Sequence, residues 1–135
     1  MNPIIEKMYN ADAFSQWLGI ERIDEGPGYS IIQMEVRPEM VNGFGIAHGG
    51  ITFSLADSAF AFASNSRGKK AVSIETSINH LKTVYPGDIL RAEAEETSLG
   101  KKIAIYHVKV LRGEELVAHF KGVVYRKEED WIVEN

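Results

Sequence analysis

A long and mostly apolar run at residues 51–66 predicts a buried helix. The run contains no Pro or Gly, its residue types favour helix, and Asp57 is its only ionisable side chain. We expect a helix of about 16 residues, on the order of 24 Å long, that is buried around most of its circumference. The carboxylate of Asp57 then needs hydroxyl partners, a subunit interface, or a cleft in which a raised pKa is useful.

Segments with period-two alternation flank this helix and predict strands. A first strand region is broken by the turn signal Gly26-Pro27-Gly28, and four more regions follow the helix; the five regions are residues 20–36, 71–82, 89–97, 102–111 and 116–126. In the second region the alternation places four residues on one face, namely Val72, Ile74, Thr76 and Ile78. We expect an α+β fold in which a single antiparallel sheet of five to six strands wraps one long central helix. Residues 1–18 predict an N-terminal helix, and the acidic residues 128–135 predict a frayed tail.

The composition is that of an ordinary globular protein. The 135 residues are 44% hydrophobic and 25% charged, which predicts one domain over residues 1–135. There is no cysteine, so we expect neither disulfides nor thiol chemistry. The N-terminus lacks a basic segment followed by an apolar run, and no apolar stretch reaches about 18 residues. We therefore expect a cytoplasmic protein with no membrane segment.

The charge is unevenly distributed along the chain. Residues 1–66 hold 3 Lys and Arg against 8 Asp and Glu, a net charge of −5, whereas residues 67–127 hold 12 against 7, a net charge of +5. The overall charge of −4 argues against nucleic acid as the main partner. The basic second half is suited to attract a phosphorylated small molecule.

The loop before the helix carries the candidate chemistry. It contains Asn42 and ends in His48-Gly49-Gly50, directly before the apolar run. The first N–H groups of a helix lack partners and lie at its positive end, and the two glycines let a ligand oxygen approach them. An oxyanion site followed by Asp57 about two turns later suggests acyl transfer or ester-type hydrolysis. A tight turn that leads into a buried helix is the simpler alternative.

Other catalytic motifs fit the sequence poorly. The histidines have no ligand-like spacing, which argues against a metal site; they are His48, His80, His107 and His119. The sequence has no Gly-x-Ser-x-Gly, which argues against a serine esterase. The glycine pattern at residues 43–48 lacks the third glycine and the βαβ context of a dinucleotide site.

The loop and helix together resemble the hotdog-fold acyl-CoA thioesterases of the phenylacetate-degradation (PaaI-like) type. The match consists of Asn42, of His48-Gly49-Gly50, and of the run Phe53-Ser54-Leu55-Ala56-Asp57-Ser58-Ala59-Phe60-Ala61. It extends over about residues 15–126, nearly the whole chain. The resemblance implies the hotdog fold and a homodimer with shared active sites, usually doubled to a tetramer. In similar enzymes Asn42 and Gly49 come from one subunit and Asp57 from its partner.

The resemblance also implies a reaction, hydrolysis of an acyl-CoA thioester to free acid and CoA without a cofactor or metal. The Gly49 backbone N–H would form the oxyanion hole, Asn42 would place the carbonyl or the water, and Asp57 would act as nucleophile or general base. Ser73 is a candidate polar partner of the attacking water. His48 is a candidate for a loop brace or, secondarily, for a direct chemical role. Candidates for contacts with the acyl group or CoA are Gly50, Phe53, Arg67, Lys69, Lys82, Lys101 and Lys102.

Several alternatives stay open at this point. The expected substrates are phenylacetyl-CoA and its ring-hydroxylated relatives, followed by medium-chain acyl-CoAs. A non-catalytic acyl-CoA-binding hotdog module is the alternative function. A dehydratase, with His48 paired to Asp57, fits less well, because His-Gly-Gly before the helix is more typical of thioesterases.

Overall fold

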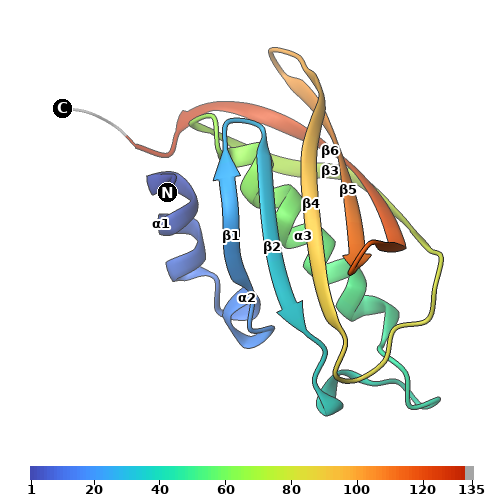
Figure 1. Ribbon diagram of the computed structural model, residues 1–135. Coiled ribbons are helices and arrows are strands. Elements are labelled where there is room, and N and C mark those ends of the chain that lie inside the picture. The colour runs from blue at the N-terminus through green and yellow to red at the C-terminus, as the bar shows by residue number, and fades with distance from the viewer. Residues whose placement is uncertain (133–135) are drawn as a thin grey trace.

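One long helix, α3 (Gly49–Asn65), packs against one face of a six-stranded antiparallel sheet in the computed structural model, which describes residues 1–132 (Figure 1). The strand order is β1-β2-β4-β5-β6-β3. The strands are β1 (Glu21–Gly26), β2 (Tyr29–Glu35), β3 (Lys69–His80), β4 (Ile89–Leu99), β5 (Ile103–Arg112) and β6 (Glu115–Asp130). The shorter helices are α1 (Pro3–Ala11), α2 (Ala13–Trp17) and the 3₁₀ turn η1 (Pro38–Met40). The predicted α+β architecture is confirmed.

Helix α3 forms the centre of the hydrophobic core. Eleven of its 17 residues are buried, which agrees with a run that is apolar around most of the helix. Phe60 packs against the rings of Tyr106 and Phe120, which lie on β5 and β6. Gly122 in β6 makes this contact possible, because a Cβ there would lie 2.5 Å from the Phe60 ring.

The predicted alternation holds in the inner strands and fails in β3. In β2, Ile32 and Met34 are buried, as expected for residues that face the helix. In β3, however, Val72 and Ile74 are 42% and 56% exposed whereas Thr76 and Ile78 are partly buried, so the prediction that these four residues share one face is wrong. The reason is that β3 is an edge strand and that its pairing with β6 shifts register between Ser73 and Glu75, which interrupts the period of two.

The predicted single N-terminal helix is two helices, α1 and α2. The break lies at Asp12, whose side chain accepts the Ser15 N–H at 2.9 Å and so begins α2. The Ser15 hydroxyl in turn lies 2.8 Å from the Ser58 hydroxyl of α3. This tertiary contact and the cap favour a second helix start over a continuous helix.

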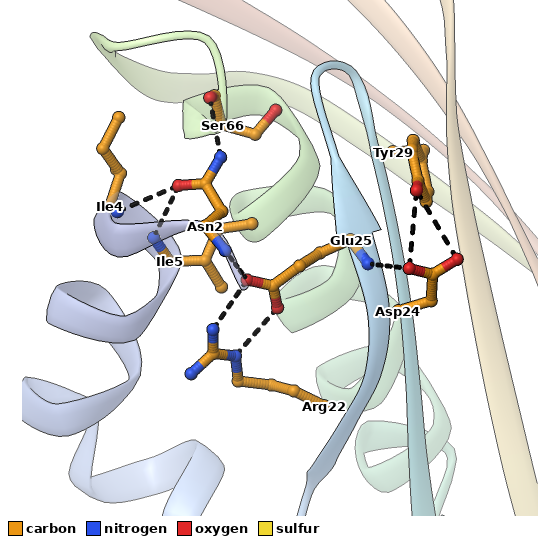
Figure 2. A network of polar contacts seen from close by, with 8 residues as sticks. All are labelled: Asn2, Ile4, Ile5, Arg22, Asp24, Glu25, Tyr29 and Ser66. Atoms are coloured by element: carbon orange, nitrogen blue, oxygen red, sulfur yellow. Dashed lines mark hydrogen bonds and ion pairs between the residues drawn. The ribbon is translucent and has the colours of Figure 1, made fainter.

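The N-terminus is anchored to α3 and to β1 by a polar network (Figure 2). The Asn2 side chain caps α1 by accepting the N–H groups of Ile4 and Ile5, and its amide donates to the Ser66 carbonyl at 3.1 Å. The backbone N–H of Asn2 donates to Glu25, which also pairs with Arg22. One residue thus connects the first helix to the end of α3 and to the sheet.

The C-terminal segment is more ordered than predicted. The frayed tail predicted over residues 128–135 is wrong for its first part, because β6 continues to Asp130 and pairs there with Lys69. Trp131 then donates its indole N–H to Asn65 at the end of α3. Residues 133–135 lie outside the described part of the chain. Among the residues that the structure describes, no helix has the length and apolar character needed to cross a membrane.

Candidate active site

A cleft of about 310 Å³ lies at the N-terminal end of α3. Its walls come from the loop after η1, from the first turn of α3 and from the segment that follows β3. Asn42, Gly49 and Lys82 all line it, so the structure brings together three of the residues selected from the sequence. His80, which the sequence did not single out for this site, lines it too.

Backbone hydrogen bonds hold the walls of this cleft in place. The Ala47 N–H donates to the Val84 carbonyl at 2.8 Å, which ties the loop to the segment between β3 and β4. Within the loop, the side-chain oxygen of Asn42 accepts the Phe44 N–H at 2.9 Å. The amide N–H₂ group of Asn42 makes no hydrogen bond within residues 1–132, so it can donate to a group bound in the cleft.

The two glycines at the start of α3 differ in what their N–H groups do. The His48 side chain caps the helix, with its Nδ1 atom accepting the Gly50 N–H at 2.9 Å. The Gly50 N–H is therefore not available to a ligand, and His48 acts as a brace of the loop. No hydrogen-bond acceptor lies within reach of the Gly49 N–H in residues 1–132, although it borders the cleft. The Gly49 N–H is thus a donor at a positive helix end without a partner.

Asp57 lies two turns further along α3 and does not line this cleft. Its carboxylate is partly buried and makes no hydrogen bond or ion pair with any residue between 1 and 132. Burial raises the pKa of Asp57, and the negative charge of Asp12 raises it further. The neighbouring Ser58 hydroxyl is directed to Ser15 instead. The alternative in which hydroxyl groups satisfy the carboxylate therefore finds no such partner within residues 1–132.

The remaining predicted residues are distributed over other parts of the molecule. Ser73 is exposed on the edge strand β3 and is not part of the cleft. Phe53 packs edge-on against Phe120, with ring centroids 5.5 Å apart, and belongs largely to the core. Arg67 makes two hydrogen bonds to Glu96, at 2.9 and 3.0 Å, and Glu96 also accepts the Tyr106 hydroxyl. Arg67 is thus engaged within the chain.

The connection between β4 and β5, which contains Lys101 and Lys102, lies at the opposite end of the sheet from the start of α3 (Figure 1). The two lysines border a second cleft, of about 530 Å³, together with Lys69, Arg126 and Lys127. Within a single chain these lysines therefore do not share a cleft with Lys82. Any common ligand would have to involve a second chain.

The alternation along β3 contains a signal for the position of His80. His80 comes two residues after Ile78, on the same face of β3, and the pair partners of these residues are Ala118 and Phe120 on β6. Both partners are buried, so this face is directed toward α3. Extending the alternation of residues 71–82 by one step places His80 at the helix N-terminus.

Comparison with known proteins agrees with this geometry. Residues 44–119 match the thioesterase superfamily. An esterase-like protein of Archaeoglobus fulgidus is 45% identical over 92% of this chain and 81% of its own length. The acyl-coenzyme A thioesterase PaaI of Escherichia coli is 38% identical over 88% of this chain and 86% of its own. The solved structure of E. coli PaaI superposes with a TM-score of 0.90, at 36% identity, over 93% of this chain and 91% of that one.

The chain belongs to the thioesterase superfamily. The hotdog fold and the resemblance to the PaaI-like members, both inferred from the loop and helix motif, are confirmed.

Proposed function

We propose that the protein hydrolyses an acyl-CoA thioester to the free acid and CoA. The observation that carries this proposal is the unpartnered Gly49 N–H, at the positive end of α3 and in one cleft with Asn42. A donor held in this way is suited to a carbonyl oxygen on which negative charge develops. The similarity to the E. coli acyl-coenzyme A thioesterase supports the same substrate class.

In the proposed reaction, the thioester oxygen accepts the Gly49 N–H while the Asn42 amide positions the carbonyl or the water. Water attacks the carbonyl carbon as Asp57 takes one of its protons, the C–S bond breaks, and the proton is returned to the leaving thiolate. Direct attack by Asp57, giving a mixed anhydride that water then opens, is the second route. The raised pKa of Asp57 suits both routes, since a more basic carboxylate is a better general base and a better nucleophile.

The proposed site requires two chains, because Asp57 and Gly49 do not meet in one. The twelve-residue edge strand β3 exposes Val72 and Ile74, and antiparallel pairing with β3 of a second copy would cover both and remove an open edge from each sheet. This pairing would place the partner's Asp57 near the Gly49 cleft. Ser73, on the same strand, would then lie at the interface and could contact the attacking water.

The same pairing suggests how the CoA moiety is held. Lys82 lies in the Gly49 cleft, where it can reach a phosphate of the substrate. In an antiparallel pair, the Lys69 end of one β3 lies beside the His80 end of the other. The cleft of Lys101 and Lys102 would therefore adjoin the partner's substrate. Arg67 would have to leave Glu96 to contribute, so we rank it last.

For the acyl group, phenylacetyl-CoA and its ring-hydroxylated relatives are the first substrates to test, followed by medium-chain acyl-CoAs. Phe53 is only partly buried at the cleft end of α3, and we propose it as the aromatic side chain that contacts the acyl group.

The test is thiol release from a panel of acyl-CoAs by the wild type, by Asp57→Asn and by the matched control Asp24→Asn, which alters an exposed carboxylate on β1. We expect turnover by the wild type, a loss of roughly 10²–10⁴-fold in Asp57→Asn with acyl-CoA binding retained, and no loss in the control. Equal rates for the two Asp57 forms would contradict the assignment of Asp57. Acyl-CoA binding by the wild type without thiol release would instead establish the non-catalytic binding module.

A further inference from the structure

We infer that His80 is a second hydrogen-bond donor to the thioester group of the substrate, acting beside the Gly49 N–H. The inference rests on the proposed hydrolysis and extends it by a residue outside the His-Gly-Gly and Asp57 motif. It is carried by the position of the imidazole, by its lack of other partners and by the chemistry of its ring.

The backbone around His80 is fixed by β6. His80 is the last residue of β3 and pairs with Ala118. Immediately after it, the N–H groups of Leu81 and Lys82 both donate to the Val117 carbonyl, at 2.8 and 3.1 Å. Pairing with Ala118 and the two bonds to Val117 therefore fix the backbone at His80 and directly after it. The Cα atom of His80 thus has a fixed position at the mouth of the cleft.

The imidazole lies against the backbone of Gly49. A Cβ built on Gly49 would be 3.4 Å from His80 Nε2 and 3.5 Å from its Cε1 atom. A glycine at this position thus leaves room between the ring and the helix N-terminus. None of the hydrogen bonds within residues 1–132 uses the His80 ring. Its Nε2 atom is therefore available to a group bound beside Gly49.

An imidazole at this place complements the Gly49 N–H. A developing oxyanion is stabilised best by more than one donor aimed at the same oxygen. Neutral imidazole donates from one ring nitrogen, and the protonated ring donates from both. When the proton is on Nε2, the His80 ring and the Gly49 N–H are two donors that line the same cleft and could reach the same oxygen atom. Because the carbonyl oxygen gains charge only in the transition state, such a donor raises kcat more than it lowers KM.

The test compares His80→Phe and His80→Gln with the wild type on one acyl-CoA. We expect His80→Phe to lower kcat by about 10²-fold with KM nearly unchanged, since removal of an oxyanion donor costs about 10²–10³-fold. The amide of His80→Gln supplies an N–H at a similar reach and should recover part of the loss. His107→Phe is the matched control, because its ring lies on the face of the sheet away from α3, between the buried Tyr106 and Val108.

A binding measurement keeps the inference testable apart from turnover. In Asp57→Asn, which we expect to bind without hydrolysis, the affinity for a CoA analogue with a trifluoromethyl ketone in place of the thioester, whose hydrate imitates the tetrahedral intermediate, is compared with that for an alkyl-CoA thioether that lacks the carbonyl oxygen. Addition of His80→Phe should reduce the preference for the carbonyl compound and leave the thioether affinity unchanged. A kcat within about twofold of wild type, or a change in KM alone, would overturn the role of His80. Absence of hydrolysis by the wild type would overturn the proposed function, and an unaltered carbonyl preference would then overturn His80 as well.

Discussion

The two edge strands of the sheet, β1 and β3, differ in length, in charge and in how far other segments of the chain cover them. β1 has six residues, shifts register against β2 after Arg22 and carries exposed acidic side chains. The N-terminal segment ties onto it, since Asn2 donates to Glu25 and the Tyr9 hydroxyl donates to the carbonyl of Ile20 just before the strand. β3 has twelve residues and exposes Val72 and Ile74. Short, charged and irregular edges resist pairing, so the β1 edge is protected while the β3 edge remains suited to a partner.

This difference between the edges matters for function because the candidate site lies on the side of β3. His80 ends that strand, Lys82 follows it, and the Gly49 cleft opens beside both. The β1 side holds the anchoring network of the N-terminus. Changes at the β3 edge should therefore reduce activity, whereas changes at the β1 edge should leave it unaltered.

The largest effect is expected from a charge placed on the β3 edge. Val72→Lys puts an ammonium where we propose that two strands meet, and should give a monomer with activity reduced by about 10²-fold or more, since each site would lose its acid/base group. Ile23→Lys is the control, because Ile23 is 41% exposed on β1 against 42% for Val72. Light scattering and thiol release measure both outcomes. A monomeric wild type, or equal behaviour of the two variants, would refute the proposed interface.

A mixing experiment sharpens the same point. Asp57→Asn and Gly49→Pro should each be nearly inactive alone, because one lacks the base and the other lacks the backbone N–H at a first helical position that tolerates proline. After mixing and subunit exchange, half of the dimers contain both chains and each such dimer has one intact site of two, so about one quarter of wild-type activity should return. No recovery after proven exchange would mean that Asp57 does not act across the interface.

A smaller effect concerns stability and pH. Burial raises the pKa of Asp57, so the folded state disfavours its ionised form and loses stability as the pH rises above the ordinary aspartate pKa of about 3.9. Asp57→Asn should therefore unfold at a higher denaturant concentration than wild type at neutral pH, and the difference should vanish in acid. Denaturant titrations at several pH values measure this; a variant less stable than wild type at neutral pH would show that the carboxylate is a structural group.

The smallest effect is expected at the protected edge. Asn2→Ala removes the cap of α1 and the bond to Ser66, and should lower the free energy of unfolding by about 1 kcal/mol. The activity of this variant should equal that of wild type, because the Gly49 cleft is at the other end of α3. A loss of activity without loss of stability would show that the β1 side communicates with the site.

The sequence predicted well those helices and strands whose apolar face is buried within the same chain. Helix α3 and strand β2 follow their periodicity closely, because every inward position has a partner within the chain. The break at Asp12 has a local signal in the Asp12 cap of Ser15, but the preference for two helices over one also depends on the contact between Ser15 and Ser58, 43 residues apart. The exposed part of β3 was misjudged because its register shift is set by β6.

The candidate site was predicted in the same uneven way. The loop motif correctly brought Asn42 and Gly49 to one cleft, because capping and loop closure are local. Sequence reasoning could not show that Arg67 is engaged by Glu96, or that Lys101 and Lys102 lie at the far end of the sheet, because both depend on strand order. His80 follows the alternation of residues 71–82, but its place beside Gly49 depends on how β3 packs against the start of α3.

The contact of Tyr106 with Glu96, which also binds Arg67, affects the ultraviolet absorbance of the protein at alkaline pH. The Tyr106 hydroxyl is buried and donates to the Glu96 carboxylate at 2.7 Å, and burial followed by this bond raises the Tyr106 pKa far above that of a tyrosine in water. The stability gained from the neutral phenol is intact below about pH 10 and declines at higher pH, where the unfolded chain ionises first. Of the five tyrosines, Tyr106 should therefore form tyrosinate last, only as the sheet opens, so that its ultraviolet absorbance reports alkaline unfolding without an added dye.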